Sequence, residues 1–288
     1  MLSVLQKEFE ESQTTCGDSL RPLRLCVIDF KQNSMPRKPK VMGVIPARYA
    51  SQRLPAKPLI DLLGKPMIQR VYEQASKARL LDQVIVATDD ARIEMVVKKF
   101  GGRVMLTAPE IRSGSDRVAA VAEKIEGDIF VNIQGDEPLI APEMIDEAVQ
   151  VLLDDPAMPV GTLAKKIESI DELLNPGVVK VALGENQLAL YFSRSVIPFL
   201  RDIPNQREWL RHATFYKHIG IYVFRADFLK IYSGAMESRL ELAEKLEQLR
   251  VLENGYRIKV GITRFDSIPI DTKEDAERVI HMLKNSPS

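Results

Sequence analysis

The sequence has few cysteines, no excess of either charge and no long apolar run, and each absence argues against a class of protein. Its two cysteines, Cys16 and Cys26, are too few and too isolated for a disulfide framework or a zinc site. The 40 basic and 40 acidic residues cancel, which argues against nucleic-acid or membrane-surface partners. No apolar run approaches the roughly 20 residues that span a bilayer, and the charged stretch Met1 to Glu11 lacks the apolar core of a secretory signal. We therefore expect a cytoplasmic protein.

Residues 1–40 differ from the rest of the chain. Their hydrophobic periodicity is poor, and residues 32–40 are polar and interrupted by prolines. We expect a weakly structured N-terminal extension here, followed by one domain over residues 41–288. Met35 lies just before the first predicted strand and is a candidate for the true start of translation; an intact mass of the native protein that begins at Met1 would contradict this.

From Val41 onward, short apolar runs alternate with amphipathic stretches. The apolar runs predict strands at residues 41–47, 83–89, 103–107 and 128–134. The stretches between them predict a helix that opens with Pro66, a second at 91–100 and a third capped by Ser115 or Asp116 and ending near Ile125. This alternation is typical of an α/β fold, with a Rossmann-like, mostly parallel sheet that helices flank on both faces.

The second half of the chain mixes its predicted elements differently. Strands are predicted at residues 178–183, 188–192, 218–224 and 257–262, with helices at 238–253 and 273–283. No internal repeat and no clear linker separates this half from the first. We therefore expect a smaller mixed subregion inserted in the same domain.

The loop after the first predicted strand carries Arg48, Arg53 and Lys57 in a stretch stiffened by three prolines. Ligands of open α/β sheets bind beyond the carboxyl ends of the strands, where three cations can neutralise a triphosphate. The chain has no P-loop, and no G-x-G-x-x-G follows this strand, which disfavours an ordinary nucleotide hydrolase or a dinucleotide oxidoreductase. The alternative is that these cations are solvated loop charges.

Two acidic motifs are candidates for a metal site. Asp136 directly follows the fourth predicted strand, and Gly135 beside it permits close backbone approach. This arrangement suits a Mg²⁺ ion bound jointly by protein and phosphate oxygens. Asp271 is a second acid, just before the last predicted helix. Asp271 or Thr272 could instead be the N-cap of that helix, and the residues alone leave this choice open.

The segment from Ile45 to Pro58 closely resembles the signature loop of the 3-deoxy-manno-octulosonate cytidylyltransferases, and the resemblance extends from Val41 to Leu283. It implies a fold of the nucleotide-diphospho-sugar transferase type. The implied reaction transfers CMP from CTP to the anomeric hydroxyl of 3-deoxy-D-manno-octulosonate (Kdo), releasing pyrophosphate, for lipopolysaccharide synthesis. It also implies Mg²⁺ as cofactor and a homodimer paired through the mixed second half. Residues 1–40 match no part of the family.

The resemblance also implies which residues contact each substrate. Lys57, Arg48 and Asp136 are the implied catalytic residues, and Asp136 and Asp271 the implied metal ligands. The implied nucleotide contacts are Ala47, Arg48, Arg53, Lys57, Ser113, Gly114 and Arg117. The implied sugar contacts are Gln134, Arg194, His218, Tyr222, Glu247 and Gln248.

The chain departs from the family motifs at three positions. Ser115 stands for threonine, Asp116 for glutamate and Lys217 for arginine, so charge or hydroxyl is retained while fine geometry differs. Two alternatives stay open: the same chemistry on 8-amino-Kdo or another acid sugar, and a non-catalytic CTP-binding homologue. Retention of Lys57 and both aspartates favours an active enzyme. The sequence identifies no general base.

Overall fold

The computed structural model describes residues 37–49, 54–111 and 113–285. The chain divides into two units, Met1–Lys38 and Pro39–Ser288, and the second contains every element described below. Most of the predicted N-terminal extension, with Met35, lies outside the described residues, as does Arg53.

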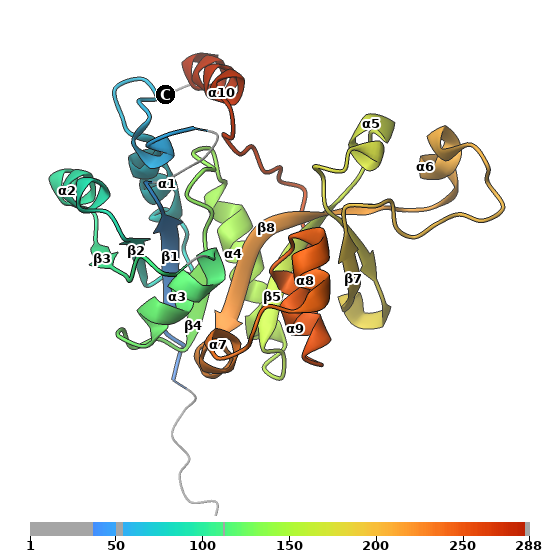
Figure 1. Ribbon diagram of the computed structural model, residues 1–288, viewed down its shortest axis with the longest axis horizontal. Helices are drawn as coiled ribbons and strands as arrows, with labels where there is room; N and C mark the ends of the chain where they lie inside the picture. The colour runs from blue at the N-terminus through green and yellow to red at the C-terminus, as the bar shows by residue number, and fades with distance from the viewer. Residues whose placement is uncertain (1–36, 50–53, 112, 286–288) are drawn as a thin grey trace, which may run out of the picture. The chain divides into compact units, whose positions relative to one another are not determined.

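Within the described residues, nine strands form one sheet in the middle of the second unit (Figure 1). They are β1 (Val41–Ala47), β2 (Gln83–Thr88), β3 (Val104–Leu106), β4 (Ile129–Asn132), β5 (Val160–Lys166), β6 (Lys180–Leu183), β7 (Ala189–Ser193), β8 (Tyr216–Arg225) and β9 (Ile258–Ile262). The main path runs β3-β2-β1-β4-β8-β5-β9. Its β3-β2-β1-β4 portion and the β5-β9 pair are parallel, whereas β8 runs antiparallel to β4, β5 and β6. The predicted mostly parallel sheet is confirmed.

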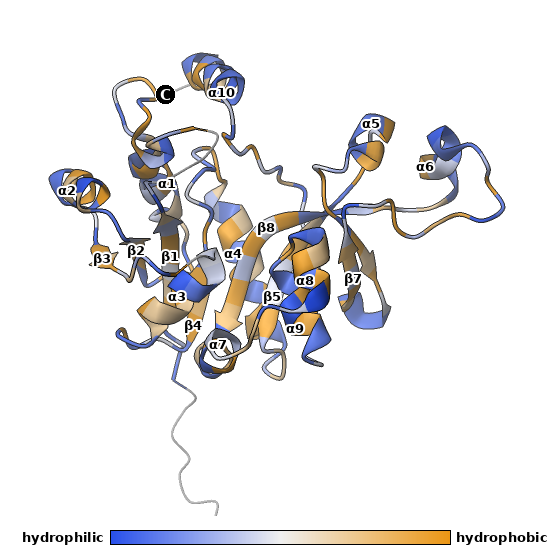
Figure 2. Ribbon diagram, viewed as in Figure 1, coloured by the Kyte–Doolittle hydropathy of each residue, from blue (hydrophilic) through white to orange (hydrophobic). Residues whose placement is uncertain are grey.

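Helices cover both faces of this sheet because its strands are apolar on both sides. In β1, Val41 and Ile45 face one hydrophobic core, and Met42 and Val44 face another. The first core includes buried residues of α1 (Met67–Ala75), α2 (Ala91–Lys99) and α4 (Pro142–Asp154). The second includes buried residues of α3 (Gly114–Ala122), α7 (Ala226–Ser233) and α9 (Gln248–Glu253). Figure 2 shows β1 and β4 mostly in hydrophobic colours, whereas α2 and α8 (Arg239–Glu244) also carry blue residues.

The mixed subregion projects to one side of the sheet in Figure 1, where α5 (Ile170–Leu174), α6 (Trp209–His212) and β7 are drawn in yellow shades. It has a small core of its own, formed by Ile167, Leu173, Trp209 and Phe215. The first half of β8 joins it to the main sheet by pairing with β6. The predicted subregion is therefore present.

α10 (Lys273–Asn285) packs on a separate small core. None of the helices in the described part is both long and apolar enough to cross a membrane.

Three local predictions need correction. Ser113, not Ser115 or Asp116, caps α3, because its Oγ accepts the N–H of Asp116 at 3.0 Å. Pro66 is the N-cap of α1 and not its first helical residue. The single helix predicted at 238–253 is two helices, α8 and α9, because Lys245 between them has a left-handed φ of 55°.

Candidate active site

Lys57 lies between the two carboxylates predicted as metal ligands. Its Nζ donates to Oδ2 of Asp136 at 2.6 Å and to Oδ1 of Asp271 at 2.9 Å. Burial lowers the pKa of Lys57, but the two carboxylates outweigh this effect and raise the pKa above its ordinary value. The three residues come from distant parts of the chain: the loop after β1, the segment after β4 and the segment before α10. The fold therefore builds one charged centre from three separate motifs.

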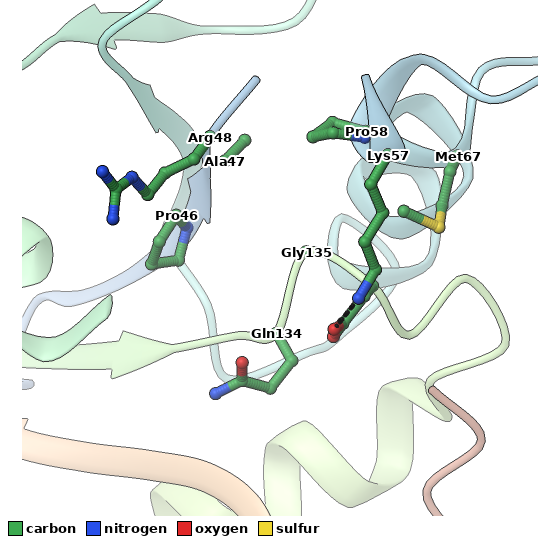
Figure 3. Close-up of a pocket in the computed structure, with 9 residues that line it drawn as sticks. Pro46, Ala47, Arg48, Lys57, Pro58, Met67, Gln134 and Gly135 are labelled. Carbon is green, nitrogen blue, oxygen red and sulfur yellow. Dashed lines mark hydrogen bonds and ion pairs between the residues drawn. The ribbon is translucent and has the colours of Figure 1, made fainter. Parts of the chain in front are cut away.

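A cavity of about 230 Å³ opens above this centre. Figure 3 shows Arg48 on one side of the cavity and Lys57 on the other, with the Lys57 amine directed at a carboxylate oxygen. Gly135 is required in the wall, because a Cβ there would lie 2.7 Å from the carbonyl oxygen of Pro46. The lining residues are Pro46, Ala47, Arg48, Lys57, Pro58, Met67, Gln134, Gly135 and Asp136.

In the segment before α10, the helix N-cap and the candidate metal ligand are two different residues. Thr272 caps the helix: its Oγ1 accepts the N–H of Asp275, while the Asp275 carboxylate accepts the N–H of Thr272. Asp271 is thereby left to direct its carboxylate at Lys57. A backbone hydrogen bond of 2.9 Å from Ile270 N to Asp136 O holds this segment beside the other aspartate. Asp271 therefore belongs to the charged centre.

The two carboxylates also fit a divalent cation. Their oxygens converge on one positive charge, the Lys57 ammonium, and Mg²⁺ is commonly held by one or two carboxylates together with substrate phosphates. Among the residues that the structure describes, no cluster of three or more His, Cys, Asp or Glu side chains could hold a metal. Asp136 and Asp271 can therefore supply two ligands to Mg²⁺, and substrate phosphate oxygens would supply others.

A second cavity, of about 260 Å³, shares Gln134 with the first. The Gln134 amide donates to the carbonyl oxygen of Gly220 on β8 at 2.7 Å, which fixes it between the two cavities. Five of the six predicted sugar contacts line this second cavity. The lining residues are Gly114, Asn132, Gln134, His218, Gly220, Tyr222, Lys245, Leu246, Glu247 and Gln248.

Hydrogen-bonding side chains dominate this second cavity. His218 is uncharged at neutral pH, because burial lowers its pKa to about 3, and a ring nitrogen lies 3.0 Å from Thr162 Oγ1. Burial raises the pKa of Tyr222 well above its usual range. Burial also raises the pKa of Glu247, although hydrogen bonds from Ser115 partly offset the rise. The Nε2 of Gln248 is buried without a hydrogen-bond partner in the described structure. Such a cavity suits a polyhydroxylated ligand.

Three predicted contact residues lie outside the cavity walls. Arg117 is fully buried and binds Thr107, Asp89 Oδ2 (3.2 Å) and the Ile111 carbonyl oxygen. Arg194 donates from Nε to the Glu244 carbonyl oxygen at 2.8 Å. Ser113 caps α3, as described above. None of these three residues lines either cavity, and Arg53 lies outside the described residues.

Comparison with known proteins places the chain in a family. A model described as Cytidylyltransferase matches residues 42–259. A 3-deoxy-manno-octulosonate cytidylyltransferase of Parabacteroides distasonis is 53% identical over 252 residues, covering 85% of this chain and 99% of the relative. One from Geobacter metallireducens is 50% identical over 251 residues, covering 85% and 98%. The chain belongs to the 3-deoxy-manno-octulosonate cytidylyltransferase family.

Solved structures agree with this cytidylyltransferase assignment. A CMP:2-keto-3-deoxy-manno-octonic acid synthetase complexed with CTP is 45% identical, with a TM-score of 0.79, and the match covers 85% of this chain and 98% of that one. A 4-diphosphocytidyl-2C-methyl-D-erythritol synthase from Anaerococcus prevotii is 14% identical, with a TM-score of 0.56 over 86% of this chain and all of the other. The second likeness shows the fold alone. The resemblance and the predicted fold type are confirmed.

Sequence reasoning missed one acid beside this cytidylyltransferase site. Asp89 lies between two arginines: its Oδ2 is 3.8 Å from Arg48 Nε and 3.2 Å from Arg117 Nη2. Asp89 thus lies next to both the buried Arg117 and Arg48, a cation of the first cavity. The signal was available, because Asp89 ends the second predicted strand at the same sheet edge as the cation loop. The rule that pointed to that loop also points to Asp89.

The buried His218 predicts a pH dependence of stability. The unfolded histidine titrates near 6.5, whereas burial lowers the folded pKa to about 3. As the pH falls below about 6.5, the unfolded state takes up a proton that the folded state does not, so the free energy of unfolding decreases. Between pH 7 and pH 5 the free energy of unfolding should therefore decrease by about 2 kcal/mol less in His218→Gln than in the unchanged chain. Urea unfolding of both proteins at the two pH values measures this, and identical pH dependence would refute it.

Proposed function

We propose that this chain transfers CMP from CTP to the anomeric hydroxyl of Kdo, giving CMP-Kdo and pyrophosphate. The observation that carries the proposal is the pair of neighbouring cavities that share Gln134 in their walls. The first is lined by Arg48, Lys57 and Asp136, with Asp271 paired to Lys57, and suits a nucleoside triphosphate with its metal ion. The second offers Gln134, His218, Tyr222 and the Glu247–Gln248 pair to a sugar. The names and high identity of the relatives point to the same reaction.

In this reaction the anomeric oxygen forms a bond to the α-phosphorus, and the bond from that phosphorus to the oxygen bridging the α and β phosphates breaks. Pyrophosphate leaves with the bonding electrons, and the proton of the anomeric hydroxyl is released to solvent. Lys57 and Arg48, on opposite sides of the first cavity, would neutralise phosphate charge during the transfer. Gln134, between the two cavities, would hold the sugar beside the nucleotide. Positioning and electrostatic stabilisation by these side chains would supply most of the rate enhancement.

Asp136 and Asp271 would hold Mg²⁺, which when bound neutralises phosphate charge. Asp271→Asn keeps the size of the side chain but removes its charge. Even loss of a residue that only orients a metal ligand costs about 10–100-fold in affinity, so the half-saturating Mg²⁺ concentration should rise at least about tenfold. Titration of activity with Mg²⁺ at saturating CTP measures the shift. Asp266→Asn, in the same segment but paired with Lys165 at 2.6 Å, serves as the control, and equal Mg²⁺ dependence in the two variants would exclude Asp271 as a ligand.

The direct test of the function is release of pyrophosphate from CTP, Mg²⁺ and Kdo by the purified chain. Omission of Kdo or of Mg²⁺ should abolish the release. Kdo and 8-amino-Kdo compared side by side would identify the preferred sugar, because the nucleotide cavity does not distinguish them. A folded chain that binds CTP without releasing pyrophosphate would instead support the non-catalytic alternative.

We further propose that the chain is a cytoplasmic homodimer whose product serves lipopolysaccharide synthesis. Exposed apolar side chains in the mixed subregion support the dimer: Leu190 on β7 is 64% exposed and Phe199 is 70% exposed. Protein interfaces commonly use large apolar side chains that are exposed in the single chain. Light scattering should give twice the 32.5 kDa chain mass, and Leu190→Lys with Phe199→Lys should give the monomer mass. A monomeric mass for the unchanged chain would contradict the dimer.

A further inference from the structure

Asn132, the last residue of β4, is buried in the wall of the second cavity with only half of its amide hydrogen-bonded. The residue is 2% exposed, and its Nδ2 donates to Ser115 Oγ at 3.4 Å. Its Oδ1 has no hydrogen-bond partner in the part of the chain that the structure describes. A buried oxygen left without a donor costs about 1–3 kcal/mol. Such an atom calls for an explanation, and a bound ligand is one.

The neighbouring hydroxyl determines which amide atom lacks a partner. The Asn132 NH₂ group faces the Ser115 hydroxyl, because Nδ2 lies 3.4 Å from Ser115 Oγ and donates to it. The other end of the amide, Oδ1, accepts no hydrogen bond from a described residue, and an amide oxygen can only accept. The atom without a partner is therefore an acceptor.

Asn132 lies where the two cavities approach each other. It is opposite Val44 of β1 on one side and Tyr222 of β8 on the other. A Cβ added to Gly114 would lie 3.4 Å from Asn132 Nδ2 and 3.7 Å from Pro46 Cγ. Pro46 lines the first cavity, whereas Gly114, Asn132 and Tyr222 line the second. A substrate bound in either cavity can therefore place a group beside Asn132.

We infer that Oδ1 of Asn132 accepts a hydrogen bond from a hydroxyl group of a bound substrate, which makes Asn132 a binding residue for the reaction; this inference rests on the proposed function. Phosphate and carboxylate groups are excluded as partners when ionised, because they are acceptors only. The acid sugar and the ribose of CTP both carry hydroxyl donors. Either can supply the missing hydrogen.

The test compares the unchanged chain with Asn132→Leu, which has a similar shape but no acceptor. Each is assayed with Kdo analogues that lack one hydroxyl and with CTP analogues that lack one ribose hydroxyl. One analogue should lower kcat/KM of the unchanged chain by about tenfold, the size of one buried hydrogen bond. The same analogue should lower kcat/KM of Asn132→Leu by less than about twofold, because the partner is already lost. If that analogue is a Kdo analogue, the sugar donates the hydrogen bond to Asn132; if it is a CTP analogue, the ribose does.

Asn254→Leu is the matched control, because the Asn254 amide donates to the Arg250 carbonyl oxygen outside the second cavity. It should show the same tenfold loss as the unchanged chain. Asn132→Ser, with a shorter side chain, replaces the leucine variant if circular dichroism shows that the latter is unfolded. Equal losses for every analogue in the unchanged chain and the folded Asn132 variant would overturn the inference. Failure of the unchanged chain to release pyrophosphate from CTP and Kdo would instead contradict the proposed function.

Discussion

Replacing Lys57 with methionine should lower the turnover number about 100- to 1,000-fold, the usual effect of removing one donor that stabilises transition-state charge. Methionine is unbranched and only one atom shorter than lysine, so the cavity should nearly retain its shape. The half-saturating Mg²⁺ concentration should fall in the same variant, because the ammonium no longer competes for Asp136 and Asp271, which it binds at 2.6 and 2.9 Å. Steady-state kinetics with separate titrations of CTP and Mg²⁺ measures both effects.

Two further variants sharpen this test. Lys57→Arg keeps the charge but replaces a compact ammonium with a planar guanidinium, so it should recover only part of the lost rate. Lys65→Met removes a lysine that pairs with Glu73 at 2.7 Å and is 43% exposed, and it should leave turnover unchanged. A turnover number within about threefold of the unchanged chain in Lys57→Met, a difference of less than about 0.7 kcal/mol, would refute the transition-state role.

The parts of the site that the sequence predicted lie at the ends of predictable strands. Continuous apolar runs mark β1 and β4, and in a parallel sheet their carboxyl ends point to the same edge. The strand pattern by itself therefore predicts that the loop with Lys57 and the residue Asp136 lie at the same edge of the sheet. Asp271 lies 214 residues from Lys57 in sequence, and no local pattern brings two such segments together. Family resemblance, not periodicity, linked Asp271 to the site.

Other features depended on contacts that no local pattern carries. The break between α8 and α9 occurs at Lys245, a residue with no sequence tendency to adopt a left-handed conformation. β5 and α4 were not predicted, although β5 fills the sheet position between β8 and β9. The unpaired Oδ1 of Asn132 depends on the place of Ser115 in three dimensions. Ion pairs between buried side chains, such as that of Arg250 with Glu241, likewise appear only once the helices have packed.

Arg250→Met should destabilise the folded chain by about 3–5 kcal/mol, because it leaves a buried carboxylate without its partner. Arg250 and Glu241 are 4% and 5% exposed. The guanidinium donates to both Glu241 oxygens, at 2.5 and 2.8 Å, and a third nitrogen lies 3.3 Å from an Asp116 oxygen. Its Cζ lies 4.7 Å from the centre of the Tyr232 ring. The free energy of unfolding in urea measures the loss, and Arg278→Met, which removes an exposed pair with Asp275, should cost less than about 1 kcal/mol.

A second substitution separates the cost of the lone charge from the loss of packing. Glu241→Gln in the Arg250→Met background removes the unpaired carboxylate but keeps an oxygen that can accept the Ser238 N–H, as Glu241 does at 3.0 Å. The double variant should regain at least about half of the lost stability, since replacing both members of a buried pair is often close to neutral. A double variant no more stable than Arg250→Met would contradict the electrostatic explanation. Both Arg250→Met and the double variant should have a higher KM for Kdo than the unchanged chain. Arg250 links α9 to Asp116 of α3, and α9 begins at Gln248 in the wall of the second cavity.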